Sequence, residues 1–106
     1  MNAVAERAAR FVCERTGISP TDLLSQRRQA PLVRARKLFV WAVRWWAPEI
    51  SYAAIGRMLS GRDHTSIIHL YREAVFLIGY DSAFRELTED WKATARRTME
   101  VPRACA

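Results

Sequence analysis

Apolar residues recur every three or four positions over most of this chain, a spacing that predicts α-helices rather than strands. In the clearest repeat, Leu32, Ala35, Phe39, Ala42 and Trp46 share one helix face. The pattern predicts helices over residues 2–16, 19–25, 31–47, 51–60, 63–80 and 81–99. No segment has the pattern of a strand. We therefore expect an all-α fold with about six helices.

Capping residues and helix breakers mark the predicted ends. Gly17 can end the first helix in the left-handed conformation, and Pro48 stops the long one. With 106 residues, the chain is expected to form a single domain over residues 1–106, with its core in about 4–97 and a frayed tail over 100–106. The residues placed to cap the helix starts are Asn2, Ser19, Ser51, Asp63 and Asp81.

Two helical patterns joined by a tight turn lie between Ser51 and Gly79, which is the form of a helix-turn-helix. Gly61 can take the positive φ that such a turn needs. In this motif the second helix enters the major groove of DNA, and its first residues reach base edges. Capping by Asp63 puts Asp63, His64, Thr65 and Ser66 on the first turn. Helical spacing places Ile67, Tyr71, Ala74, Val75 and Ile78 on the core side and Thr65, His69 and Arg72 on the outer side.

The net charge of +6 is concentrated in one segment. No acidic residue lies between Asp22 and Glu49, whereas the 11 basic residues elsewhere match 11 acidic ones. Such a patch predicts a polyanionic partner. A membrane surface is disfavoured because the patch adjoins a helix-turn-helix rather than a lone amphipathic helix. The basic residues of the segment are Arg27, Arg28, Arg34, Arg36, Lys37 and Arg44.

Two sequence elements resemble a known family. The run GRDHTS at 61–66, preceded by SYAAIG at 51–56 and followed by IIH at 67–69, is similar to the signature of the C-terminal DNA-binding domain of the bacterial replication initiator DnaA. The run DLLSQRR at 22–28 resembles a second element of that domain. The resemblance covers about residues 4–97 and implies a Trp-repressor-like helix-turn-helix fold.

The resemblance also implies a role for each site residue. Arg28 would read the minor groove, where a narrow A·T-rich groove attracts arginine. Asp63, His64, Thr65 and Ser66 would read bases in the major groove, since a carboxylate accepts from cytosine and threonine offers a hydroxyl and a methyl. Asp63 could instead act only as a cap, and Arg62 could be only a surface residue. Contacts to the DNA backbone or beside the groove are expected from Arg27, Arg34, Arg36, Lys37, Arg44, Ser51, Tyr52, Arg62, His69 and Arg72.

Three departures from the family pattern are visible. Ser66 stands where threonine is usual and lacks the methyl that packs on thymine, a change worth roughly 1 kcal/mol at most. Ser60 stands where glycine is usual, which restricts the turn. One extra residue lies between Arg44 and Ser51, in a loop.

Other chemistries are disfavoured by spacing. The sequence has no G-x-x-x-x-G-K-[ST] phosphate loop, so we expect no bound nucleotide or other cofactor. Asp63, His64 and Ser66 radiate from one helical turn and cannot form a catalytic relay. His64 and His69 lie five residues apart, which does not suit two metal ligands on one helix face. Cys13 and Cys105 are expected to be free thiols, with a disulfide as the less favoured alternative. The longest apolar run is too short to span a membrane.

These observations predict a bacterial, cytoplasmic, nucleoid-associated protein. It should bind double-stranded DNA as a monomer at DnaA-box-like sites and regulate replication initiation or transcription. A natural small protein is favoured over an excised domain of a longer initiator. The alternative is a protein-interaction module that binds the initiator or another regulator through Trp41 and Trp45 of the Trp-rich helix.

Overall fold

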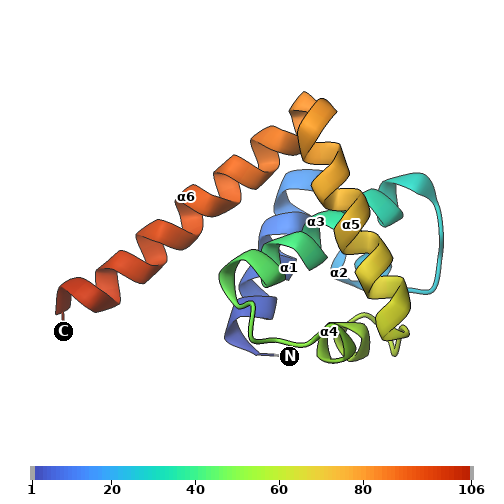
Figure 1. Cartoon of the computed structure of the whole chain (residues 1–106), viewed down its shortest axis with the longest axis horizontal. Coiled ribbons are helices and arrows are strands. Elements are labelled where there is room, and N and C mark those ends of the chain that lie inside the picture. The colour runs from blue at the N-terminus through green and yellow to red at the C-terminus, as the bar shows by residue number, and fades with distance from the viewer. Residues whose placement is uncertain (1, 106) are drawn as a thin grey trace.

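Six helices make up the fold seen in the computed structural model, which describes residues 2–105 and their side chains as far as Arg97 (Figure 1). In chain order they are α1 (Ala3–Thr16), α2 (Pro20–Leu23), α3 (Ala30–Trp46), α4 (Tyr52–Met58), α5 (His64–Tyr80) and α6 (Ser82–Cys105). No strand occurs over the described range. The predicted all-α fold with six helices is therefore confirmed.

The predicted caps are in place. The side-chain oxygens of the five capping residues accept hydrogen bonds from backbone amides two or three residues later, at 2.8–3.3 Å. Gly17 ends α1 with a φ of 75°. Each cap satisfies an amide that would otherwise lack a partner at a helix start. Local sequence chemistry therefore sets where most helices begin.

Three helix ends differ from the prediction by two residues or more. The helix α4 ends at Met58 instead of near Ser60. The short helix α2 ends at Leu23 instead of near Ser25, because the carbonyls of Asp22, Leu23 and Ser25 accept hydrogen bonds from the Arg36 side chain. The last helix continues to Cys105, beyond the end predicted near residue 99 and into the predicted frayed tail. Pro102 lies within this last stretch and removes one backbone N–H donor from it.

The core is built around α3, which packs against α1, α5 and α6. Trp91 of α6 is fully buried, and its ring contacts those of Phe11 and Trp46 at centroid distances of 5.3 Å. The indole N–H of Trp91 donates to the carbonyl of Ala42 at 3.0 Å, so this large side chain leaves no buried donor unpaired. The distal part of α6 extends away from the body (Figure 1). Within the described residues, no helix is both long and apolar enough to cross a membrane.

Trp41 and Val75 lie differently from the prediction. Trp41 is only 5% exposed, because α6 packs over α3 and brings the amine of Lys92 to 5.9 Å from the ring centroid. Trp45, the other tryptophan of the predicted protein contact, is 36% exposed and stacks on Trp41. Val75 was expected in the core but is 47% exposed, because α5 is buried along a narrower stripe that includes Ile67 and Ala74.

Candidate nucleic-acid interface

The helix-turn-helix is formed by α4, a turn over residues 59–63 and α5. In the turn, the amide of Arg62 donates to the carbonyl of Gly56 at 2.9 Å. A Cβ at Gly56 would lie 2.1 Å from the Arg62 carbonyl oxygen, so only glycine fits there. Gly61 has a φ of 73°, as predicted, and Ser60 before it also has a positive φ, of 62°. Ser60 thus adopts a conformation that glycine reaches more easily.

The first turn of α5 presents the predicted base-reading residues to solvent. Asp63, His64, Thr65 and Ser66 are all exposed. Asp63 caps the helix through the amide of Thr65. The hydrogen bond from the Thr65 side chain lowers the pKa of the Asp63 carboxyl, and the bond from the Thr65 amide lowers it further. Its other oxygen lies 3.3 Å from Nδ1 of His64. Asp63 therefore acts as a cap and still keeps an accessible carboxylate.

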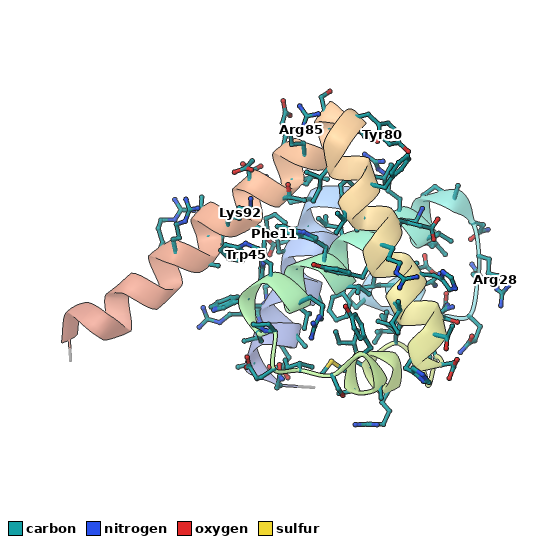
Figure 2. All side chains as sticks on the ribbon, in the orientation of Figure 1. Phe11, Arg28, Trp45, Tyr80, Arg85 and Lys92 are labelled. Atoms are coloured by element: carbon teal, nitrogen blue, oxygen red, sulfur yellow. The ribbon has the colours of Figure 1, made fainter. Side chains whose placement is uncertain are left out.

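The basic loop between α2 and α3 brings Arg28 to the same side of the molecule as α5. Arg27 and Arg28 are both exposed, and Arg28 lies at the outer edge of the loop in Figure 2. A cavity of about 240 Å³ separates the loop from α5. It is lined by Arg28, Val33, Arg36, Arg62, Ser66, His69 and Leu70. The structure thus gathers residues from both sequence elements around one hollow.

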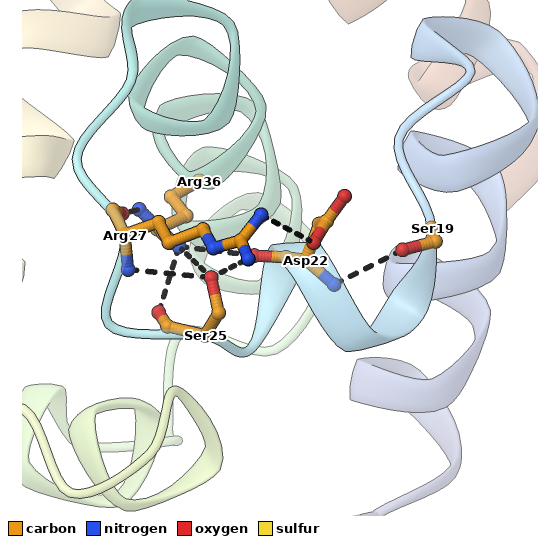
Figure 3. A network of polar contacts seen from close by, with 5 residues as sticks. All are labelled: Ser19, Asp22, Ser25, Arg27 and Arg36. Atoms are coloured by element: carbon orange, nitrogen blue, oxygen red, sulfur yellow. Dashed lines mark hydrogen bonds and ion pairs between the residues drawn. The ribbon is translucent and has the colours of Figure 1, made fainter.

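Arg36 is too deeply buried to contact DNA. The prediction that it touches DNA beside the groove is corrected, because only 1% of the residue is exposed. Its guanidinium donates to the carbonyl of Leu23 at 2.8 Å. It also donates to the carbonyls of Arg27, Asp22 and Ser25 at 2.6–3.0 Å, and Figure 3 draws these three residues around it. Burial lowers the pKa of Arg36, and the positive charge of Arg62 lowers it further. Arg36 shapes the basic loop from inside.

Arg62 is half-buried and joins the turn to the loop. Its Nη2 donates to the carbonyl of Ser25 at 2.9 Å. Burial lowers the pKa of Arg62, and the charge of Arg28 adds to this effect. Its Nε is buried and has no hydrogen-bond partner in the described part of the chain. Most of the Arg62 guanidinium donors are therefore not used by the protein.

Three other basic residues of α3 have internal partners. Arg34 forms an ion pair with Asp81 at 2.6 Å, and Lys37 pairs with Glu73 at 3.4 Å. Arg44 donates to the carbonyls of Pro48 and Ile50 and lies 4.4 Å from the ring centroid of Tyr52. Because Asp81 caps the far end of α5, Arg34 is about 25 Å along that helix from His64. The structure does not bring Arg34 together with the first turn of α5.

The remaining predicted contact residues lie on or near α4 and α5. Ser51 is exposed and caps α4, while Tyr52 is half-buried. His69 and Arg72 are exposed on the second and third turns of α5, the side of α5 that the helical spacing assigned to the outer face. Among the described residues, no group of three His, Cys, Asp or Glu gathers as metal ligands would. Cys13 is a free, half-buried thiol, and the Cys105 side chain lies outside the described residues.

Sequence reasoning missed two residues that hold the site together. The hydroxyl of Ser60 donates to the carbonyl of Leu24, and Nε2 of Gln26 donates to the carbonyl of Ser60 at 3.0 Å. These residues lie more than 30 positions apart along the chain. Only the unusual serine before Gly61 gave a local signal, and it pointed to backbone restriction rather than to a contact.

Comparison with known proteins supports this assignment of the motif. Residues 5–73 match the family described as the bacterial dnaA protein helix-turn-helix. The chain is 36% identical over 87 residues to the chromosomal replication initiator protein DnaA of a Bradyrhizobium species, an alignment that covers 82% of this chain and 18% of that protein. The protein of the same name from Xanthobacter autotrophicus is 36% identical over 86 residues, which cover 81% of this chain and 17% of that protein. The one from Brucella abortus is 33% identical over 84 residues, which cover 79% of this chain and 17% of that protein. The chain thus spans less than a fifth of the length of these relatives.

Proposed function

Because the chain belongs to the family of the bacterial DnaA helix-turn-helix, a DNA-binding domain linked to replication initiation, we propose that it recognises DnaA-box-like sites in double-stranded DNA. The observation that carries this proposal is the hollow shared by Arg28 with Ser66 and His69. A recognition helix and a loop arginine on one side of a molecule can read two neighbouring grooves at once.

The first turn of α5 would enter the major groove. There Asp63 can accept a hydrogen bond from a cytosine amino group, while His64, Thr65 and Ser66 offer polar groups to base edges. Arg28 would enter the adjacent minor groove, where its exposed guanidinium meets the negative potential of a narrow A·T-rich stretch. Specificity would therefore come from two separate elements of the sequence.

Phosphate contacts would orient the protein without reading sequence. Arg27, His69 and Arg72 are exposed and available for this role. Lys37 can exchange its partner Glu73 for a phosphate, because an ion pair with an exposed carboxylate is weak. Ser51 and Tyr52 at the start of α4 would meet the DNA backbone that the first helix of the motif crosses. Arg44 donates to the carbonyls of Pro48 and Ile50, just before Ser51, so it would act mainly by holding the start of α4 in place.

We further propose that the chain binds as a monomer at the nucleoid, in the bacterial cytoplasm, as one domain over residues 1–106. The DnaA-box-like site is taken to be asymmetric, and an asymmetric site needs no second copy of the protein related by two-fold symmetry. The sequence lacks a phosphate loop, so this segment would occupy boxes without driving ATP-dependent assembly. Its effect would be to compete with the initiator or to control nearby transcription. Unchanged initiation and unchanged nearby transcripts in cells that overproduce the protein would contradict both versions.

A protein-contact role is a second candidate, carried by a different surface from the one the sequence predicted. Trp41 is buried and cannot contribute, but α5 exposes Val75, Phe76 and Tyr80 at 47%, 67% and 62%. Exposed apolar groups that cluster in this way are typical of interaction sites. Replacing Arg28 with alanine separates the two candidates, because a protein-contact function should survive that change and box recognition should not.

Methylation protection tests the two-groove geometry directly. Dimethyl sulfate methylates guanine N7 in the major groove and adenine N3 in the minor groove, so one reagent reports on both. We expect the bound chain to protect guanines facing α5 and adenines facing Arg28. With Arg28→Ala, the adenine protection should disappear while the guanine protection remains at saturating protein. Absence of adenine protection by the parent chain would contradict the proposed placement of Arg28.

A further inference from the structure

Side-chain hydrogen bonds join the turn of the helix-turn-helix to the basic loop. The hydroxyl of Ser60 donates to the carbonyl of Leu24, and Nε2 of Gln26 donates back to the carbonyl of Ser60 at 3.0 Å. Nη2 of Arg62 adds a third bond, to the carbonyl of Ser25. Ser60 and Gln26 therefore form a reciprocal pair between two segments that are distant in the sequence, and we call this pair the clasp.

The backbone of Ser60 has a conformation that serine rarely adopts. Its φ is 62°, and among the described residues only Ser60 and two glycines have a positive φ. Side chains are crowded in this region, and such conformations persist where the surrounding structure determines them, often at functional sites. Here the loop engages both the hydroxyl and the carbonyl of Ser60. Glycine would reach the same φ more easily but has no hydroxyl to donate.

Arg28 depends on its neighbours for its position. It is exposed and makes no hydrogen bond in the described part of the chain. The residues before it are held from two sides. Arg36 of α3 binds the carbonyls of Ser25 and Arg27 from inside, and the clasp holds Gln26 from the turn. Of these contacts, only the clasp leads directly to the helix that would enter the major groove.

The clasp lies close to both reading elements along the chain. Gln26 comes two residues before Arg28, and Ser60 comes three residues before Asp63, the cap of α5. Two or three residues of fully extended chain span at most about 7–11 Å. A hydrogen bond between Gln26 and Ser60 therefore limits how far Arg28 can move relative to the first turn of α5.

We propose that Ser60 and Gln26 are positioning residues for DNA recognition. The clasp would fix the loop that carries Arg28 relative to α5, so that both elements meet their bases in one register. The inference rests on the function proposed above. A loop already held in its bound conformation loses less conformational entropy when a complex forms. Replacing Ser60 by glycine, the residue usual in the family pattern, should therefore relax the backbone and yet weaken recognition.

A double-mutant cycle tests the clasp. Fluorescence anisotropy at about 0.15 M salt gives the affinity for a box duplex and for a scrambled duplex. The four proteins are the parent chain, Ser60→Gly, Arg28→Ala and the double variant. Ser60→Gly should weaken binding to the box about 2- to 10-fold, the range for ordering one flexible side chain on binding. In the Arg28→Ala background the same change should have little effect, because no arginine then has to be placed.

A second variant and two controls isolate this effect. Gln26→Ala removes the other half of the clasp and should show the same dependence on Arg28. The matched control is Gln29→Ala in the same loop, since Gln29 is exposed and its side chain makes no capping hydrogen bond. That variant should bind the box as the parent does. Thr65→Ala should have the same effect with and without Ser60→Gly, because Thr65 belongs to α5 and not to the loop.

Urea denaturation separates positioning from folding. The urea midpoint of Ser60→Gly should stay close to that of the parent, because the relaxed backbone offsets the lost hydrogen bond. A lower midpoint with equal weakening on both duplexes would show a purely structural role and overturn the proposal. So would Ser60→Gly and Arg28→Ala effects that simply multiply in the double variant. If the parent itself does not prefer the box to the scrambled duplex, the proposed function is wrong instead.

Discussion

Replacing Arg36 with methionine should destabilise the fold far more than a surface arginine would. Methionine keeps an unbranched side chain in the same place but removes every donor. In the structure, the guanidinium of Arg36 donates to four carbonyls and one hydroxyl of residues 22–27. The substitution therefore removes the polar contacts that shape the basic loop and leaves the packing of α3 largely intact.

The expected size of the effect follows from which acceptors lose their only partner. The carbonyl of Ser25 keeps its hydrogen bond from Arg62, and that of Asp22 keeps those from the backbone and side chain of Ser25. The carbonyls of Leu23 and Arg27 have no other partner in the described contacts. An unsatisfied buried acceptor costs about 1–3 kcal/mol. Two such carbonyls would cost about 2–6 kcal/mol together. Because water can reach the carbonyl of Arg27 and reduce its share, we expect a loss of about 2–4 kcal/mol in the free energy of unfolding.

Urea denaturation followed by circular dichroism and tryptophan fluorescence measures this loss. The matched control is Arg34→Met, two residues away on α3, which removes an ion pair whose two side chains are 39% and 27% exposed. Partly exposed pairs contribute little, so the control should lose no more than about 1 kcal/mol. A variant Arg36→Met that is as stable as the parent but no longer binds DNA would show that Arg36 contacts DNA directly, and would refute the structural role argued here.

Three further predictions concern stability and reactivity. Gly56→Ala should destabilise the fold by at least about 1–3 kcal/mol in the same denaturation assay, because its Cβ would meet the carbonyl oxygen of Arg62 at 2.1 Å; a stable alanine variant would contradict the tight turn. The hydrogen bond from Arg34, the backbone amide of Phe84 and the charge of Arg34 lower the pKa of Asp81 from 3.8 to about 2. Its contribution to stability should therefore be full above about pH 4 and should be lost as the pH falls through 2. In an Asp81→Asn variant, the free energy of unfolding should no longer include this fall at acid pH. A variant with the same pH dependence of stability as the parent would argue against the ion pair between Arg34 and Asp81. Burial raises the pKa of the Cys13 thiol, and Glu14 adds to the effect. Cys13 should therefore react with iodoacetamide at pH 8 more slowly in the folded protein than in denaturant. Equal reaction rates would contradict its burial.

The helix starts could be predicted from sequence because their causes are local. An N-cap such as Asp63 and the three residues after it carry nearly all the information about where a helix begins. The same holds for Gly61, whose positive φ follows from the turn. The recognition helix and its exposed first turn therefore follow from the amino-acid sequence alone.

Arg36 shows what local reasoning cannot reach. The family resemblance implied a DNA contact for it, and neither a motif nor a charge reveals whether an arginine points outward or inward. The carbonyls that bind it belong to a loop about ten residues earlier, so the contact is not local in the sequence. Trp41 was misplaced for a related reason, since α6, 50 positions later in the chain, covers that face of α3.

Equilibrium binding to a short duplex that carries the DnaA box, compared with a scrambled duplex over a salt series, tests the proposed recognition most directly. At about 0.15 M salt we expect a preference for the box of about 10³-fold or more, as is typical of specific DNA-binding proteins. Arg28→Ala and Thr65→Ala should each reduce that preference, and Thr65→Ala should leave the salt dependence unchanged because it removes no charge. Equal, weak binding to both duplexes that vanishes as salt increases would mean that the basic segment supplies only charge, and would contradict recognition of the box.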